Sequence, residues 1–229
     1  MLFSVLSGSG SIGYKIISVL IIAVCTLLSI TLHELGHGFM AYLLGDRTAK
    51  YNGRLSLNPL SHLDPIGALC LFLFGFGWAK PVPVNPYNFK NMKGGMVLTS
   101  IAGPLMNFII AFFSTVITTI VGSMTFSSMG LLYSAMSAVY MIFNYLTILN
   151  LGLGLFNLIP IPPLDGSKIL GALLPTGAYF KYMQYERFGF IILILIINMP
   201  FFNRILYACM NAVTRFYDFI ISGALSIFM

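Results

Sequence analysis

The chain has 229 residues, of which 58% are hydrophobic and only 8% are charged. A soluble domain carries roughly 25% charged residues, so this composition excludes an ordinary soluble protein and indicates several membrane spans. The net charge of +6 lies in expected loops and at expected helix ends, which favours contact with membrane lipid and no nucleic acid partner. The three cysteines show no paired spacing, so neither a disulfide framework nor a cysteine metal site is expected.

The first predicted span covers residues 15–44 and contains the sequence HELGH at residues 33–37. His33 and His37 are four residues apart, so on a helix they share one face and can reach one divalent ion. Glu34 lies about 100° round the helix from His33. It cannot share the ligand geometry of both histidines, but it could act on a water at the ion. Ionisable residues in an apolar span are costly, which favours a functional site over a pair of structural histidines.

The connection at residues 46–94 is rich in proline and carries six of the twelve Lys and Arg residues. Within it, residues 51–57 alternate between polar and apolar side chains and could form a strand. Residues 68–76 form an apolar run too short for a spanning helix, which indicates a strand or a re-entrant segment. Closely spaced prolines keep residues 80–86 extended. We therefore expect a re-entrant β-hairpin-like loop between the first two core helices.

Further spans are expected along the rest of the chain. The second covers residues 96–121, the third covers residues 131–158, and the C-terminal spans lie within residues 182–229. A short helix is expected after the third span, at about residues 167–174. The sequence thus predicts an all-α, multi-spanning membrane protein with a bundle of about four to six transmembrane helices.

The whole chain, residues 1–229, is expected to form a single membrane-embedded domain with its core at residues 15–175. Lys and Arg are concentrated in the connections at 46–94 and 159–187, and the loop at 122–130 has none. Because cytoplasmic loops carry the excess of positive charge, both basic connections are predicted to face the cytoplasm. The expected location is therefore the cell membrane, with the HELGH site towards the cytoplasmic side.

The histidine pair needs a third ligand, because a catalytic zinc takes three protein ligands and leaves one position for water. Asp165 is favoured, since it follows the third span on the same side as the histidines and Gly166 allows a sharp turn. The alternative is that Asp165 caps the following helix. His62 and Asp64 are expected to make loop contacts. Asn157 could hold a substrate carbonyl or an oxyanion, or else link two helices.

Five motifs together carry a family resemblance: HELGH at 33–37, NPLSHLDP at 58–65, the proline-containing run at 77–86, GPLMN at 103–107 and NLIPIPPLDG at 157–166. With them, residues 15–175 resemble the site-2 protease family of intramembrane zinc metalloproteases, in its small bacterial and archaeal type without PDZ or CBS domains. The resemblance implies one Zn²⁺ per chain, bound by His33, His37 and Asp165, with Glu34 as the base. It also implies cleavage of peptide bonds within or near transmembrane segments of membrane proteins.

Substrate binding is predicted in the connection at residues 46–94. A transmembrane peptide must unwind before its bonds can be hydrolysed, and its unpaired polar groups then need partners. A strand edge that includes Leu71 and Leu73 could supply them by pairing with the substrate as an added strand, and Asn157 could contribute. The alternative is a cytoplasmic lid that only packs on lipid headgroups.

Two other classes of function could use the same residues. A zinc or cation transporter would use the histidine pair as a transport site, but it predicts acids spread along several spans, and Glu34 is essentially the only intramembrane acid. A non-catalytic membrane adaptor on the same fold would be indicated by loss of Glu34 or of a ligand residue, and all of these are present. The sequence therefore favours a zinc metalloendopeptidase.

Overall fold

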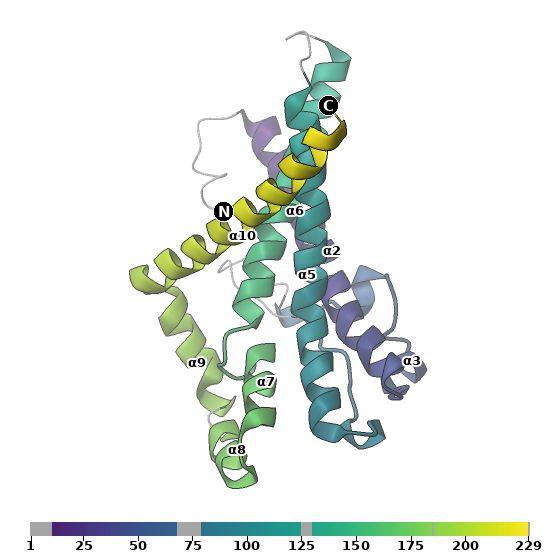
Figure 1. The fold of residues 1–229 in the computed structure, drawn as a ribbon, viewed down its shortest axis with the longest axis vertical. Helices are drawn as coiled ribbons and strands as arrows, with labels where there is room; N and C mark the ends of the chain where they lie inside the picture. Colours follow the sequence, from purple (N-terminus) through teal and green to yellow (C-terminus); the bar gives the residue numbers. More distant parts are fainter. Residues whose placement is uncertain (1–10, 68–78, 125–129, 185, 229) are drawn as a thin grey trace.

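The computed structural model describes residues 11–67, 79–124, 130–184 and 186–228 (Figure 1). This part of the chain is almost entirely helical and holds one isolated antiparallel bridge, between Leu63 and Ala79. In chain order its elements are α2 (Ile12–Leu43), α3 (Thr48–Tyr51), η1 (Pro59–Ser61), η2 (Pro86–Asn88), α5 (Met92–Ser123), α6 (Leu131–Asn157), α7 (Asp165–Leu173), α8 (Thr176–Met183), α9 (Glu186–Ile197) and α10 (Pro200–Phe228).

Three helices of the described residues, α2, α5 and α6, are long and apolar enough to cross a membrane. They have 32, 32 and 27 residues, and at about 1.5 Å per residue each exceeds the roughly 30 Å hydrocarbon core. Residues 187–197 and 200–224 would add a fourth span if these two segments, bent by 82°, count as one. An all-α, multi-spanning membrane protein is thus supported, while the expected four to six spans stay a prediction.

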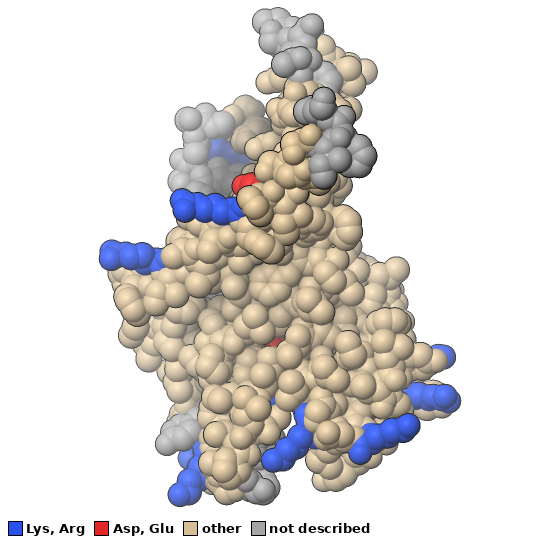
Figure 2. Space-filling view, in the orientation of Figure 1, with Lys and Arg blue, Asp and Glu red and all other residues tan. Residues whose placement is uncertain are grey.

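The surface agrees with a membrane location. Figure 2 shows Lys and Arg gathered at the end of the molecule where α3, α8 and the start of α5 lie, with a second group over α10. A broad area of this face between the charged groups carries almost no charge. The two basic connections, which contain α3 and α8, lie at the same end of the molecule (Figure 1).

Helix α5 stands in the middle of the bundle and packs against α2, α6 and α7 (Figure 1). Small residues let these backbones approach closely. A Cβ on Gly36 of α2 would lie 2.7 Å from the carbonyl oxygen of Ala102 in α5. A Cβ on Gly154 of α6 would lie 3.3 Å from the carbonyl oxygen of Pro104. The backbones of α2 and α6 therefore both pack closely against α5, at residues 102–104.

The C-terminal helix α10 packs across α5 and α6 (Figure 1). Tyr217 and Ile221 of α10 form a buried apolar cluster with Ala111 and Leu151. The Tyr217 hydroxyl also donates a hydrogen bond of 3.0 Å to the backbone carbonyl of Phe108. The chain after residue 175 is therefore joined to the core of the bundle.

The predicted strand at residues 51–57 is wrong. Tyr51 ends the short helix α3, and Gly53 then turns the chain with a positive φ of 65°. The amide of Arg54 bonds back to the carbonyl of Ala49 at 2.8 Å, so these backbone groups are satisfied locally rather than by a neighbouring strand. Residues 68–76, with Leu71 and Leu73, lie outside the described part of the chain.

Other expected elements are found close to their predicted places. Residues 80–85 form no helix before η2 begins at Pro86, because alternating prolines exclude a helix there. The helix expected at 167–174 begins two residues earlier, so Asp165 is the first residue of α7. Its N-cap position is occupied by Leu164. The alternative interpretation of Asp165 as a capping residue is therefore wrong.

Candidate metal centre

Three buried side chains converge where α2, α5 and α7 meet. His33 and His37 come from one face of α2, and Asp165 comes from the start of α7, 128 residues after His37 in the sequence. The Nε2 atoms of the two histidines are 3.0 Å apart. Oδ2 of Asp165 lies 3.2 Å from Nε2 of His33 and 3.0 Å from Nε2 of His37. These residues form a group that could hold a metal ion.

The remaining nitrogen of each imidazole has a partner on α5. Nδ1 of His37 lies 2.7 Å from the carbonyl oxygen of Thr99, which can only accept a hydrogen bond. Nδ1 of His33 lies 2.5 Å from Oδ1 of Asn107. Both Nδ1 atoms therefore carry the hydrogen, and both Nε2 atoms keep a lone pair for a ligand bond.

Two Nε2 lone pairs and one carboxylate oxygen thus point to one place, and a cation between them relieves their repulsion. Atoms bound to one tetrahedral zinc, at about 2.0–2.1 Å, lie about 3.3 Å from one another. The observed separations of 3.0–3.2 Å are close to this value. The donor set of two imidazoles and one carboxylate suits zinc and leaves a fourth position open. The residues therefore fit the ion.

Gly103 makes room for the two imidazoles. A Cβ at this position of α5 would overlap the His37 imidazole and lie 2.8 Å from Cε1 of His33. The backbone of α5 can lie against both rings only because residue 103 has no side chain. The sequence marked Gly103 as part of a motif, and the structure supplies the physical reason for it.

The Asp165 carboxylate lies between the two imidazoles and Lys168. Burial alone would raise its pKa, and the nearby positive charge of Lys168 lowers it. Nζ of Lys168 lies 3.3 Å from Oδ1, the oxygen that faces away from the histidines. Gly166 allows this position, since a Cβ there would overlap the backbone carbonyl of Leu158.

Glu34 is half-buried and lies outside the group of three, as its position on the helix predicted. Its Oε2 accepts a hydrogen bond of 2.8 Å from the backbone amide of Val82. Val82 belongs to residues 79–89, a segment that ends in the short 3-10 helix η2 and Phe89 and that we call the strap. The carboxylate is thus oriented by a backbone group from a distant part of the sequence.

Two buried charged residues hold the strap in place. The Arg54 guanidinium donates to the carbonyl of Lys80 at 2.5 Å and to that of Pro81 at 3.3 Å. Asp46, which is fully buried, accepts hydrogen bonds of 2.7 Å from the amide of Asn85 and from the side chain of Asn88. The segment that contacts Glu34 is therefore fixed on both sides of Val82.

The pKa of Asp46 reflects these contacts. Burial alone would raise it, but hydrogen bonds from Thr48, Asn88 and Asn85 outweigh burial and hold the pKa below its ordinary value. The carboxylate is therefore charged near neutral pH and remains a strong acceptor for the strap.

The other predicted site residues lie as follows. Asn157 is the last residue of α6, and its side chain donates to the carbonyl of Leu153 in the same helix at 3.0 Å. His62 bonds to the carbonyl of Ser56, and Asp64 accepts the amides of residues 66 and 67, so both make the expected loop contacts. Leu71 and Leu73 lie outside the described residues.

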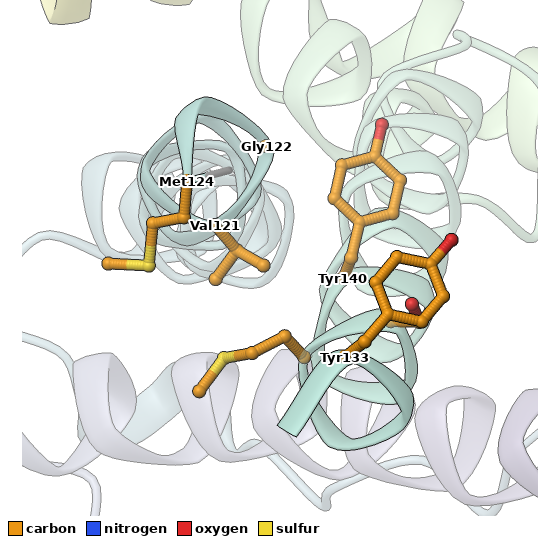
Figure 3. A pocket seen from close by; sticks show the side chains of 7 residues that line it. Val121, Gly122, Met124, Tyr133 and Tyr140 are labelled. Atoms are coloured by element: carbon orange, nitrogen blue, oxygen red, sulfur yellow. The ribbon is translucent and has the colours of Figure 1, made fainter. Parts of the chain in front are cut away.

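A shallow, mostly apolar pocket of about 210 Å³ lies elsewhere. Figure 3 shows two of its lining residues, Val121 and Met124, at the end of α5, and two others, Tyr133 and Tyr140, on the neighbouring α6. Val121 follows Asn107 by 14 residues in the same helix, which corresponds to about 21 Å along its axis. The pocket is therefore separate from the metal centre.

Comparison with known proteins identifies the family. The profile of peptidase family M50 matches residues 21–197. The chain belongs to peptidase family M50. This membership confirms the predicted site-2 protease family, a metalloprotease activity and zinc as the cofactor.

Individual relatives agree with this assignment. YwhC of Bacillus subtilis (strain 168), named as a candidate zinc metalloprotease, is 41% identical over 191 residues, which cover 83% of this chain and 86% of YwhC. Rip2 of Mycolicibacterium smegmatis, named in the same way, is 26% identical over 84% of this chain and 71% of Rip2. A zinc metalloprotease of Methanocaldococcus jannaschii is 32% identical over 64% of this chain and 32% of that protein. No solved structure gives a significant match.

Proposed function

We propose that this M50 protein is an intramembrane endopeptidase, which cleaves peptide bonds within or near transmembrane segments of membrane proteins. One observation carries the proposal: a buried group of two histidines and one aspartate lies between helices that are long and apolar enough to span a membrane. A site with this placement can reach a membrane-embedded chain, which a protease with its site in solution cannot.

His33, His37 and Asp165 would hold one zinc ion per chain. A zinc ion in such a site supplies Lewis acidity, which lowers the pKa of water to about 7 and polarises a carbonyl. Thr99 and Asn107 keep the imidazole hydrogens on Nδ1, so that both Nε2 atoms stay available. The ligand set thus depends on α5, although none of the three ligands lies on α5.

Glu34 acts as the general base and then as the acid. Its carboxylate takes a proton from the attacking water as the oxygen adds to the scissile carbonyl carbon, and it delivers that proton to the leaving nitrogen as the C–N bond breaks. The net reaction consumes one water and yields a carboxyl group and an amine. Asn157, at the end of α6, is proposed to hold the substrate carbonyl, for which its amide must leave the carbonyl of Leu153.

The substrate is proposed to be a transmembrane protein or peptide that unwinds beside the strap. Lys80 donates its amide to the carbonyl of His62 at 2.9 Å, next to the bridge between Leu63 and Ala79. This pairing brings the two ends of the intervening segment together, which supports the proposed re-entrant β-hairpin-like loop. A free edge of that loop, with Leu71 and Leu73, would pair with the unwound substrate as an added strand.

The protein is proposed to lie in the cell membrane with its active site towards the cytoplasm. The connections that contain α3 and α8 carry most of the Lys and Arg at one end of the molecule (Figure 2). The carboxyl end of α2 and the start of α7 lie next to these connections. Under the positive-inside tendency, this end faces the cytoplasm.

Cleavage of a reconstituted substrate tests the proposal. Purified protein and a model substrate with one transmembrane helix are placed in the same liposomes, and the cut site is mapped by mass spectrometry. We expect cleavage within or beside the helix by the wild type and none by Glu34→Gln. Cleavage confined to segments far from the membrane, or equal cleavage by both proteins, would contradict the proposal.

A photocrosslinking amino acid tests the substrate edge. Placed singly at Leu71, Leu73 or Val84, it should capture the residues around the scissile bond. Capture only from positions next to Asn157 would overturn the added-strand arrangement and leave the metal chemistry intact.

A further inference from the structure

Helix α6 places a fully buried side-chain amide, that of Asn150, against Asn107, the partner of His33. Asn150 has 0% exposure and lies seven residues before the end of α6. Its Nδ2 donates to the carbonyl of Leu146 and to the hydroxyl of Ser29, both at 2.8 Å. Its Oδ1 accepts a hydrogen bond of 2.7 Å from Nδ2 of Asn107.

Backbone carbonyl groups, which can only accept, fix the direction of these hydrogen bonds. The carbonyl of Leu146 can only accept, so the NH₂ group of Asn150 must point towards it. The Ser29 hydroxyl donates to the carbonyl of Cys25 at 2.7 Å and so presents a lone pair to Asn150. Asn150 therefore presents its oxygen to Asn107.

This oxygen determines which way the Asn107 amide faces. Asn107 donates from Nδ2 to Asn150 and, at 3.4 Å, to the carbonyl of Ser29, so its Oδ1 faces Nδ1 of His33. With the amide reversed, an NH₂ group would face His33 and would require the hydrogen on Nε2. That tautomer has no lone pair for an ion at the position shared with Asp165.

We propose that Asn150 is a positioning residue of the metal centre, which fixes the Asn107 amide and through it the His33 tautomer that can bind zinc. The inference rests on the ligand set of the proposed function. It assigns to α6, which supplies none of the three ligands, a role in metal affinity beyond packing. Amide pairs between spans can also act only as links between helices, so the test must separate the two roles.

The test measures zinc affinity on folded, monodisperse protein in detergent, by competition with a chromogenic chelator. Outer hydrogen-bond partners of ligating histidines typically contribute about 10–100-fold in metal affinity. We expect a loss in that range for Asn107→Leu and a loss of about 10-fold for Asn150→Leu, which removes the acceptor for Asn107.

Thr147→Val is the matched control. Thr147 lies one turn before Asn150, is buried, and faces the hydroxyl of Thr115 on α5 at 3.5 Å. Thr147→Val removes a polar contact between α5 and α6. It leaves the hydrogen bonds that connect Asn150 through Asn107 to His33 unchanged. We expect unchanged zinc affinity, even if the thermal stability falls as it does for Asn150→Leu.

Cobalt provides a second readout. Co²⁺ in place of zinc gives visible absorption bands that report the ligand set, and Asn150→Leu should weaken or shift them while Thr147→Val should not. Wild-type affinity and an unchanged cobalt spectrum in Asn150→Leu would overturn the inference, as would an equal loss in Thr147→Val. If Asn150→Leu does not fold, Asn150→Ala replaces it, because it also removes the acceptor for Asn107 and adds no bulk.

His37→Ala distinguishes failure of the inference from failure of the proposed function. If His37→Ala binds zinc as the wild type does, the ligand set itself is wrong. If His37→Ala loses zinc while Asn150→Leu keeps it at full affinity, only the role of Asn150 is wrong.

Discussion

Glu34 and Val82 are joined by a hydrogen bond of 2.8 Å from a backbone amide to a carboxylate oxygen, across 48 residues of sequence. Residues 81 and 83 are prolines and have no N–H group, so Val82 is the only backbone donor among the three. The sequence Pro-Val-Pro therefore presents a single amide, and the fold directs it at the proposed general base.

Loss of this amide should impair catalysis and leave metal binding intact. Val82→Pro removes the N–H group, whereas Val82→Ala keeps it and is the matched control. A hydrogen bond to a charged group contributes about 1.5–3 kcal/mol, so hydrolysis by Val82→Pro should fall by roughly 10–100-fold. Initial rates on the reconstituted substrate, with zinc content measured in parallel, check this. An equal loss in Val82→Ala would assign the effect to the side chain instead.

Replacement of the base should separate zinc binding from hydrolysis. Glu34→Gln keeps the size of the side chain and removes its ability to accept a proton. General acid–base groups contribute roughly 10²–10⁴-fold, and we expect a loss in that range at unchanged zinc content. Substantial turnover by Glu34→Gln would exclude the mechanism proposed for this residue.

Removal of a ligand should release the ion. We expect about one zinc per chain in the wild type, and His37→Ala and Asp165→Ala should each lose most of it. Elemental analysis of purified variants gives the content directly. A chelator should abolish wild-type activity, and added zinc should restore it. Full occupancy in Asp165→Ala would remove Asp165 from the ligand set.

Two glycine-to-alanine substitutions should differ in their effect on zinc affinity. Gly103→Ala places a methyl group against the His37 imidazole and should lower zinc affinity sharply, because the ring must move. Gly152→Ala on α6 is the control, since a Cβ there meets nothing within 4 Å. The control should bind zinc normally, and alanine is favoured over glycine within a helix by about 1 kcal/mol. Normal affinity in Gly103→Ala would show that α5 can withdraw from the histidines.

Acid should loosen the strap through Asp46. Its pKa in the folded protein lies below the ordinary value, so its contribution to stability is fully present above about pH 4. That contribution is lost as the pH falls through the lower, folded pKa. Asp46→Asn should lower stability near neutral pH and flatten the acid side of the stability curve. Thermal unfolding in detergent at a series of pH values measures both effects, and parallel curves for the two proteins would contradict the assignment.

The residues of the metal centre could be predicted because their chemistry is costly outside a functional site. Two histidines and a glutamate in an apolar span, and an aspartate after a proline-rich helix end, are visible in the sequence without knowledge of their contacts. The lack of a helix at 80–85 follows in the same way from its prolines, which exclude a helix whatever surrounds them.

Other features depend on tertiary contacts that the sequence does not display. Residues 51–57 show the alternation of a strand, yet α3 and the turn at Gly53 satisfy their backbone locally, and the guanidinium of Arg54 turns inward to bond the strap. Asn150 looked like any polar residue that links two helices, and its role behind His33 is visible only in the directions of successive hydrogen bonds. The sequence does not indicate a role for Val82, because its contact with Glu34 is made by the backbone amide and not by the side chain.

The missing side chain at Gly103 has a consequence for how the protein is assembled. His33 and His37 lie on α2, Asp165 lies on α7, and the imidazoles lie directly against the backbone of α5. The binding pocket for the ion therefore exists only while all three helices are docked, so ion binding and helix docking share one equilibrium. Zinc starvation should then reduce the amount of this protein in the membrane as well as its turnover, because separated helices become open to degradation.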